Sequence, residues 1–195
     1  MKLKVLIALF AACALSAQAA LKIGDKMPAT DVKLKGEKET SLARLTGEKG
    51  TLVIVTCNHC PYAVAWEGRI VKLGNACSKK GVGAVAINAN DPGIVPGDSW
   101  EKTMERAKSA GFQFPYVVDE TQAVAKALGA AKTPECYLFD KAGKLVYHGA
   151  VDDNHKDAGK VENHYLRVAL DALLAGKEIA VKETKAMGCG VKYRK

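Results

Sequence analysis

Two cysteines separated by two residues, Cys57 and Cys60, are the residues of this 195-residue chain whose spacing most clearly predicts chemistry. They belong to the sequence CNHC, which lies between an apolar run at 51–56 and a segment with helical periodicity at 60–78. A thiolate is the nucleophile of disulfide exchange, and the positive end of a helix lowers the pKa of a nearby thiol. The pair therefore predicts thiol–disulfide exchange.

A metal site or a structural disulfide fits the pair less well. A zinc site would need a second pair of ligands at similar spacing, whereas the remaining candidates His148, His155, His164 and Cys189 are scattered. A purely structural disulfide would close a very short loop and gain little entropy. His59, inside the motif, is either a proton donor beside the sulfurs or an exposed bystander, and both interpretations stay open. We expect no metal ion and no cofactor.

Alternating strand and helix patterns must position the cysteines. The uncharged, β-branched run at 51–56 predicts a central buried strand, and 82–88 predicts a second. Helices are expected at 60–78, 98–111, 119–129 and 163–175, further strands at 116–118, 136–140 and 145–148, and loops or a short hairpin at 21–50. Asp98 with Glu101 is typical of a capping box. This order predicts an α/β fold of thioredoxin-like type: a central mixed sheet flanked by helices, an N-terminal extension and a C-terminal tail.

The N-terminus is typical of a signal peptide. Lys2 and Lys4 precede an apolar stretch at 5–15, and AQA at 17–19 is a small-x-small cleavage pattern. We predict a signal peptide at 1–19, a single domain at 20–195, and a periplasmic or secreted protein, with lipoprotein processing at Cys13 the less favoured alternative. After cleavage we expect no stable membrane insertion. The net charge is +8, but the basic residues are mostly interleaved with acidic ones, which argues against a nucleic-acid partner.

Several motifs resemble the thioredoxin superfamily, and more narrowly its redoxin (AhpC/TSA-like) branch of peroxiredoxin-like proteins that carry CxxC. They are CNHCPY at 57–62, AINAND at 86–91, PGDS at 96–99, FPYVVDETQ at 114–122, Thr133-Pro134, and YHGAVDDN at 147–154. The resemblance implies that Cys57 is the exposed attacking cysteine and Cys60 the resolving one. It also implies that Thr133 and a cis Pro134 face the disulfide and align the substrate chain.

The chain departs from its relatives in two ways. Thr51 stands where thioredoxins have a buried acid that transfers protons, so another base, His59 or water, must serve. The peroxiredoxin pattern Pro-x-x-x-Thr-x-x-Cys is absent, because Val53 and Cys57 occupy the Pro and Thr positions counted back from Cys60. Efficient peroxide reduction is therefore not indicated.

Three further cysteines remain in the predicted domain. Cys77 lies on the apolar stripe of the helix at 60–78 and is expected to be a small buried hydrophobe. Cys136 follows Pro134 closely and is either an auxiliary thiol or a core residue. Cys189 lies between glycines, which are expected to make it mobile and accessible. It either resolves an intermediate at Cys57, pairs with Cys136, or stays free. The run Asp152-Asp153-Asn154 is typical of a solvated turn.

These features predict an exported thiol–disulfide oxidoreductase that acts on protein thiols and disulfides and on a redox partner protein. Two alternatives remain open. One is a thiol-dependent peroxidase. The other is a copper-delivery protein, in which two cysteines and a distal histidine, His148 or His155, would bind Cu(I).

Overall fold

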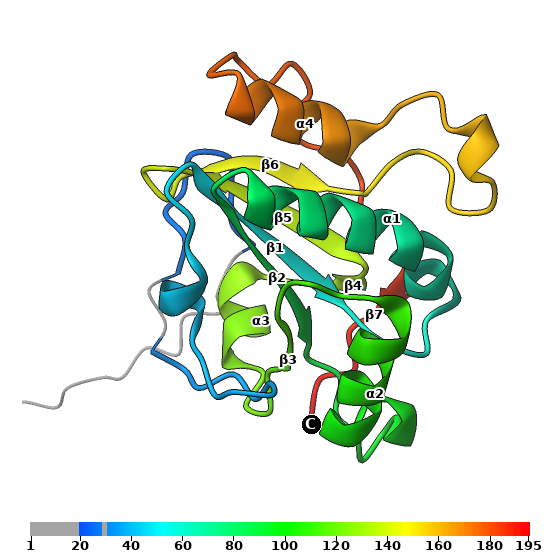
Figure 1. The fold of residues 1–195 in the computed structure, drawn as a ribbon. Helices are drawn as coiled ribbons and strands as arrows, with labels where there is room; N and C mark the ends of the chain where they lie inside the picture. The colour runs from blue at the N-terminus through cyan, green and yellow to red at the C-terminus, as the bar shows by residue number, and fades with distance from the viewer. Residues whose placement is uncertain (1–19, 29–30) are drawn as a thin grey trace, which may run out of the picture.

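A five-stranded mixed sheet forms the centre of the computed structural model, which describes residues 20–28 and 31–195. The strand order is β3-β2-β1-β5-β6 (Figure 1). The parallel strands are β1 (Gly50–Thr56), β2 (Val82–Asn88) and β3 (Tyr116–Val118), and the antiparallel ones are β5 (Glu135–Asp140) and β6 (Leu145–Gly149). The predicted mixed α/β sheet is confirmed. The predicted signal peptide lies outside the described residues.

Helices cover both faces of this sheet. Helices α1 (Pro61–Lys79) and α4 (Tyr165–Leu174) lie on one face and α3 (Ala123–Leu128) on the other (Figure 1). Side chains alternate along β1, so that Leu52 and Ile54 pack beneath α1 and α4 while Val53 and Val55 pack toward α3. Two covered faces explain why the run at 51–56 carries no charge. Within the described residues, none of the helices combines the length and the apolar character that a bilayer span needs.

Helix α2 (Trp100–Ala110) begins two residues later than predicted. Ser99 is its N-cap, with Oγ accepting a hydrogen bond from the backbone N–H of Lys102 at 3.3 Å. Residues Pro96–Asp98 form a separate 3-10 turn, which directs the fully buried Asp98 into the protein. The capping box predicted for Asp98 is therefore wrong, and its carboxylate is available for other contacts.

The C-terminal tail packs against the rest of the domain. It contains β7 (Cys189–Gly190), which pairs antiparallel with the short strand β4 (Lys132–Thr133). Further upstream, the backbone N–H of Thr184 donates to the carbonyl oxygen of His148 in β6 at 2.9 Å. In Figure 1, β7 lies beside β4 at the end of the sheet where α1 begins. Cys189, expected to be mobile and accessible, is instead half-buried and paired with Thr133.

A buried charged network joins α1 to the loop after β6. The Asp152 carboxylate is 2% exposed and accepts hydrogen bonds from Trp66 Nε1 at 2.7 Å and from Arg69 Nη1 at 2.6 and 2.8 Å. Asp152 is thus not part of a solvated turn. A buried carboxylate requires such partners, because leaving it unpaired would cost several kcal/mol.

Replacing Asp152 tests the importance of this network. Asp152→Ala leaves the Trp66 indole N–H and the Arg69 guanidinium without their acceptor, so the free energy of unfolding should fall by about 3 kcal/mol. Denaturant unfolding measures the difference. Asp171→Ala on the exposed face of α4 is the matched control and should change the free energy by less than about 0.5 kcal/mol. Equal effects of the two substitutions would contradict the structural role of Asp152.

Candidate active site

The CNHC segment connects β1 to α1, and Cys60 is the residue immediately before the helix. The first N–H groups of an α-helix lack intrahelical partners, so a sulfur at this place is close to free donors. Both thiols are covered: Cys57 is 5% exposed and Cys60 is fully buried, in a small cluster with Ala63, Tyr62 and Cys189. The expectation of an exposed Cys57 is therefore wrong in this conformation, because the tail lies over the motif.

The sulfur of Cys60 is surrounded mainly by hydrogen-bond donors. The backbone N–H of Cys189 donates to it at 3.4 Å, and the Cys57 side chain lies in the same cluster. The surroundings, with the contact to Cys57 the largest cause, outweigh the cost of burial and lower the pKa of Cys60 to about 4. The sulfur also lies 3.1 Å from the carbonyl oxygen of Thr133, to which the protonated thiol donates.

Cys57 has the opposite surroundings. Its thiol donates a hydrogen bond of 3.3 Å to the Thr133 hydroxyl, it is buried, and the carboxylate of Asp98 lies nearby. The contact with Cys60 and the burial together raise the pKa of Cys57, and the negative charge of Asp98 adds to this rise. The surroundings thus favour ionisation of Cys60 over ionisation of Cys57.

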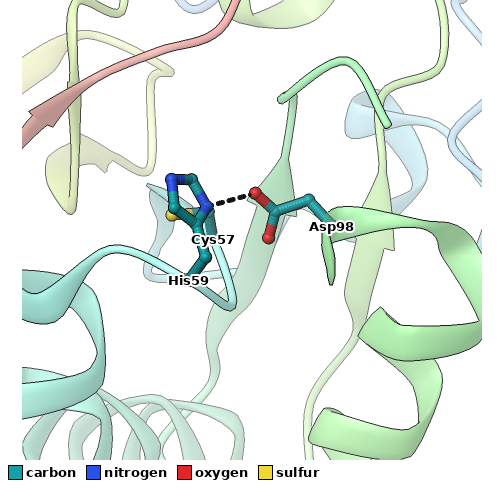
Figure 2. A group of neighbouring side chains, drawn as sticks. All are labelled: Cys57, His59 and Asp98. Atoms are coloured by element: carbon teal, nitrogen blue, oxygen red, sulfur yellow. Dashed lines mark hydrogen bonds and ion pairs between the residues drawn. The ribbon is translucent and has the colours of Figure 1, made fainter. Parts of the chain in front are cut away.

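His59 and Asp98 form a pair beside Cys57, as Figure 2 shows. His59 Nδ1 and Asp98 Oδ2 are 2.5 Å apart, and the imidazole is about one-third exposed whereas the carboxylate is fully buried. A carboxylate on Nδ1 favours the tautomer in which Nδ1 carries the proton and Nε2 accepts one. His59 is therefore held in place by a buried partner.

Asp98 is the residue of this site that sequence reasoning missed. Its carboxylate accepts hydrogen bonds from the Asn58 backbone N–H at 2.7 Å and from the Asn90 side-chain amide at 2.8 Å, besides that of His59. Asn88 of β2 donates at 3.3 Å. The signal that could have identified Asp98 is its place in the PGDS motif at 96–99. These contacts fix the loop between the two cysteines.

The donor atoms of Cys57, His59 and Asp98 lie within 4.8 Å of one another, and they are the only three-residue cluster of potential metal ligands in the described part of the chain. A metal ion there would have to displace the hydrogen bonds that already engage His59 Nδ1 and both carboxylate oxygens. The distal histidines lie elsewhere: His148 contacts Glu135, and His155 stacks on Tyr62. The copper-delivery alternative stays a prediction that these contacts do not favour.

Thr133 lies against both sulfurs, and the Thr133–Pro134 peptide bond is cis. The loop before it is held by the buried carboxylate of Glu135, which accepts hydrogen bonds from the N–H groups of Ala131 and Lys132 at 2.8 and 2.9 Å. His148 Nε2 is 2.7 Å from the other carboxylate oxygen. Thr133 and Pro134, which are predicted to face the cysteines, therefore belong to a loop that Glu135 positions. Sequence reasoning did not select Glu135.

The remaining cysteines fall into two groups by their position in the fold. Cys77 and Cys136 belong to the hydrophobic core under α1 and α4, where burial raises the pKa of both thiols. Cys189 instead contacts the cluster of Cys57 and Cys60. Cys136 is thus a core residue, and the suggested pairing of Cys189 with Cys136 does not occur in this structure.

The Glu135–His148 contact makes stability depend on pH. Burial opposes ionisation of both groups, but their mutual contact outweighs it, so the pKa of Glu135 is lowered below 4.5 and that of His148 raised above 6.5. The pair's contribution should be largest between pH 4.5 and 6.5. It should fall as Glu135 is protonated in acid and as His148 loses its proton above its raised pKa.

The difference in unfolding free energy between the wild type and Glu135→Gln measures this contribution. It should be greatest in that window and shrink as the pH rises through the folded-state pKa of His148. Glu178→Gln removes an exposed carboxylate that pairs with Lys182, and it should show no such decline near neutral pH. A pH-independent difference for Glu135→Gln would show that His148 is not charged in the folded protein.

Comparisons with known proteins identify the family and the fold. The family model described as Redoxin matches residues 22–164. The structure is similar to that of an uncharacterized conserved protein from Geobacillus kaustophilus, with 37% identity, a TM-score of 0.82, and coverage of 89% of this chain and 93% of the other. No curated protein sequence matches.

Two further solved structures show the same fold at lower identity. A thioredoxin-like protein in the oxidized form has 22% identity and a TM-score of 0.63, and the match covers 81% of this chain and all of the other. A putative thiol:disulfide interchange protein DsbE from Chlorobium tepidum has 20% identity and a TM-score of 0.58, with coverage of 80% and 99%. The chain therefore belongs to the Redoxin family and has a thioredoxin-like fold.

Proposed function

We propose that this protein is a thiol–disulfide oxidoreductase for protein substrates in which Cys60 attacks and Cys57 resolves. The observation that carries the proposal is the position of the Cys60 sulfur, which lies at the start of α1, beside Cys57, and accepts a hydrogen bond from the backbone N–H of Cys189. Membership of the Redoxin family supports redox chemistry in general. The signal-peptide pattern at 1–19 supports a location outside the cytoplasm.

The reaction has two steps. The Cys60 thiolate attacks one sulfur of a substrate disulfide, so a Cys60–substrate disulfide forms and the other substrate sulfur leaves as a thiolate. Cys57 then loses its proton and attacks the Cys60 sulfur. This forms the Cys57–Cys60 disulfide and releases the second substrate thiolate; the two protein thiols are oxidised and the substrate is reduced. The reverse sequence oxidises a substrate dithiol.

This assignment reverses the roles implied by the family resemblance, in which Cys57 attacks. The physical reason is that Cys60 lies at the start of α1 and accepts the backbone N–H of Cys189, whereas Cys57 faces the Asp98 carboxylate. A lowered pKa increases the fraction of Cys60 that is thiolate, and therefore nucleophilic, at pH 7. A stabilised thiolate also favours the reduced protein and therefore an oxidising disulfide.

His59 is suited to accept the proton of Cys57 in the second step. Asp98 binds its Nδ1, and the two residues lie within 4.8 Å of the Cys57 sulfur. A neutral imidazole in this tautomer can take the proton on Nε2, and the carboxylate stabilises the imidazolium that results. This pair takes the place of the buried acid that thioredoxins have where this chain has Thr51.

Thiol-dependent peroxide reduction is the second candidate, because a stabilised thiolate next to another thiol can also attack a peroxide. One observation favours it: Cys57, in the Thr position of the peroxiredoxin pattern, lies in one small cluster with Cys60. Val53 in the Pro position argues against it.

Two substitutions of Cys57 test the source of the Cys60 acidity. Cys57→Ala removes the strongest hydrogen-bond donor and should raise the pKa of Cys60, whereas Cys57→Ser keeps a hydroxyl donor and should raise it less. The pH dependence of thiolate ultraviolet absorbance reports both. An unchanged titration in Cys57→Ala would show that the Cys57 thiol does not stabilise the thiolate.

Activity measurements test the assignment of roles. Cys60→Ser should reduce disulfide-exchange activity toward a reduced or mispaired protein substrate to the level of the variant that lacks both cysteines. Cys57→Ser/Cys189→Ser, which lacks both of the other thiols in the cluster, should still attack and should accumulate protein joined to substrate. Cys77→Ala is the matched control, since this thiol is buried away from the site. Covalent complexes that survive in Cys60→Ser/Cys189→Ser but not in Cys57→Ser/Cys189→Ser would restore the roles implied by the resemblance, and rapid peroxide consumption would favour the second candidate.

A further inference from the structure

The C-terminal tail crosses the active site as an extended strand. Cys189 is directly opposite Thr133 in the antiparallel β4–β7 pair, and Gly190 is opposite Lys132. The backbone N–H of Val191 donates to the Ala131 carbonyl oxygen at 3.1 Å, which continues the pairing. The tail therefore forms backbone hydrogen bonds along the loop that precedes the cis peptide bond, over both sulfurs.

The approach is close at the residue before Cys189. A Cβ atom at Gly188 would lie 2.1 Å from the Thr133 carbonyl oxygen, so any side chain there would collide with the loop. The segment after Cys189 is tied down as well: the Lys192 backbone N–H donates to Asn90 Oδ1 at 2.7 Å, and Arg194 pairs with Asp91. Contacts on both sides thus bring one particular tail residue, Cys189, to the Cys60 sulfur.

We propose that β7 is an internal substrate strand and that Cys189 is a third redox cysteine, which forms a disulfide with Cys60. The proposal rests on the proposed role of Cys60 as the attacking sulfur. An extended chain that pairs with the Thr133 loop and presents a cysteine to Cys60 has the arrangement that a protein substrate must adopt. The tail and an external substrate therefore compete for the same loop, and the tail must move aside before a substrate binds.

The chemistry is a second thiol–disulfide exchange. When Cys60 holds a mixed disulfide, the Cys189 thiolate attacks the Cys60 sulfur, the Cys60–Cys189 bond forms, and the substrate sulfur leaves as a thiolate that takes up a proton. Cys57 then attacks the Cys60 sulfur in turn, which releases Cys189 as a thiolate and leaves the Cys57–Cys60 disulfide. Each step breaks one S–S bond and makes one, so no additional oxidant is required.

The charged groups around Cys189 favour its ionisation after Cys60 has reacted, and not before. In the reduced protein the contact with Cys60 is the main reason that the pKa of Cys189 is raised. Once Cys60 is in a disulfide, it carries no negative charge that opposes ionisation of Cys189. Lys192 and Lys132, whose charges lower the pKa of Cys189, then favour its ionisation. Cys189 is thus kept protonated until Cys60 has reacted.

Oxidised glutathione tests the proposal in variants that lack Cys57. In Cys57→Ser, glutathione disulfide should first modify Cys60, and Cys189 should then expel the glutathione. Intact mass spectrometry should find a protein two hydrogen atoms lighter than the reduced form, and peptide mapping should find a Cys60–Cys189 disulfide. Cys57→Ser/Cys189→Ser should instead keep one glutathione on Cys60.

Two controls accompany these variants. Cys57→Ser/Lys185→Ala alters the same tail at an exposed side chain that has no part in the proposed steps, so it should still form the disulfide. Circular dichroism of every variant verifies the fold, and wild-type protein trapped with acid during oxidation should yield the Cys60–Cys189 peptide transiently.

The outcomes separate the two proposals. If Cys57→Ser and Cys57→Ser/Cys189→Ser both retain glutathione on Cys60 to the same extent, the tail cysteine does not resolve and this inference is wrong, while the role of Cys60 stands. If glutathione attaches to neither variant at Cys60, the attacking role of Cys60 is wrong, and the inference fails with it.

Discussion

The end of an α-helix leaves N–H groups without partners, and the sulfur of Cys60 lies where α1 begins. Most of the site can be understood from this constraint. A negative charge is stabilised at that position, so the thiolate belongs there, and the second thiol becomes its donor. The fold fixes the position, because β1 is packed on both faces and delivers the CNHC segment directly to the helix.

Buried polar groups fix the loops that meet at Cys60. Asp98 holds the residues between the cysteines, and Glu135 holds the loop that carries Thr133. Each carboxylate is buried and is matched to backbone N–H groups and to one histidine, His59 or His148. Such groups are costly unless they are satisfied, which favours one arrangement of the loops over others. The two sulfurs therefore lie between the loop that Asp98 fixes, the loop that Glu135 fixes and the tail strand β7.

Local patterns are sufficient to predict the framework. The β-branched run at 51–56, the apolar stripe of α1 and the strand–turn–strand of β5 and β6 each follow from period and composition, and the structure places them as expected. Thr133 contacts the sulfurs of both Cys57 and Cys60, as the family motifs imply. Spacing and family motifs contain that information, since both cysteines lie in one short segment and the TP pair is a specific motif.

The features that sequence reasoning misses depend on contacts between distant segments. Asp98 has the sequence features of a helix cap, and only its packing against β2 and the CNHC loop reveals a buried hydrogen-bond acceptor. The glycines around Cys189 suggest flexibility, but at Gly188 they allow close approach to the Thr133 loop. Which sulfur is ionised depends on donors contributed by three separate parts of the chain, so no local pattern could decide between Cys57 and Cys60.

Site-resolved titration of the reduced protein tests the ionisation of Cys60 most directly. Carbon-13 labelling of the cysteine Cβ atoms lets NMR follow each thiol separately, and single cysteine substitutions assign the signals. We expect the Cys60 signal to change near pH 4, while the Cys57 signal keeps its thiol position through neutral pH. Ionisation of Cys57 at a lower pH than Cys60 would contradict the central role given to Cys60.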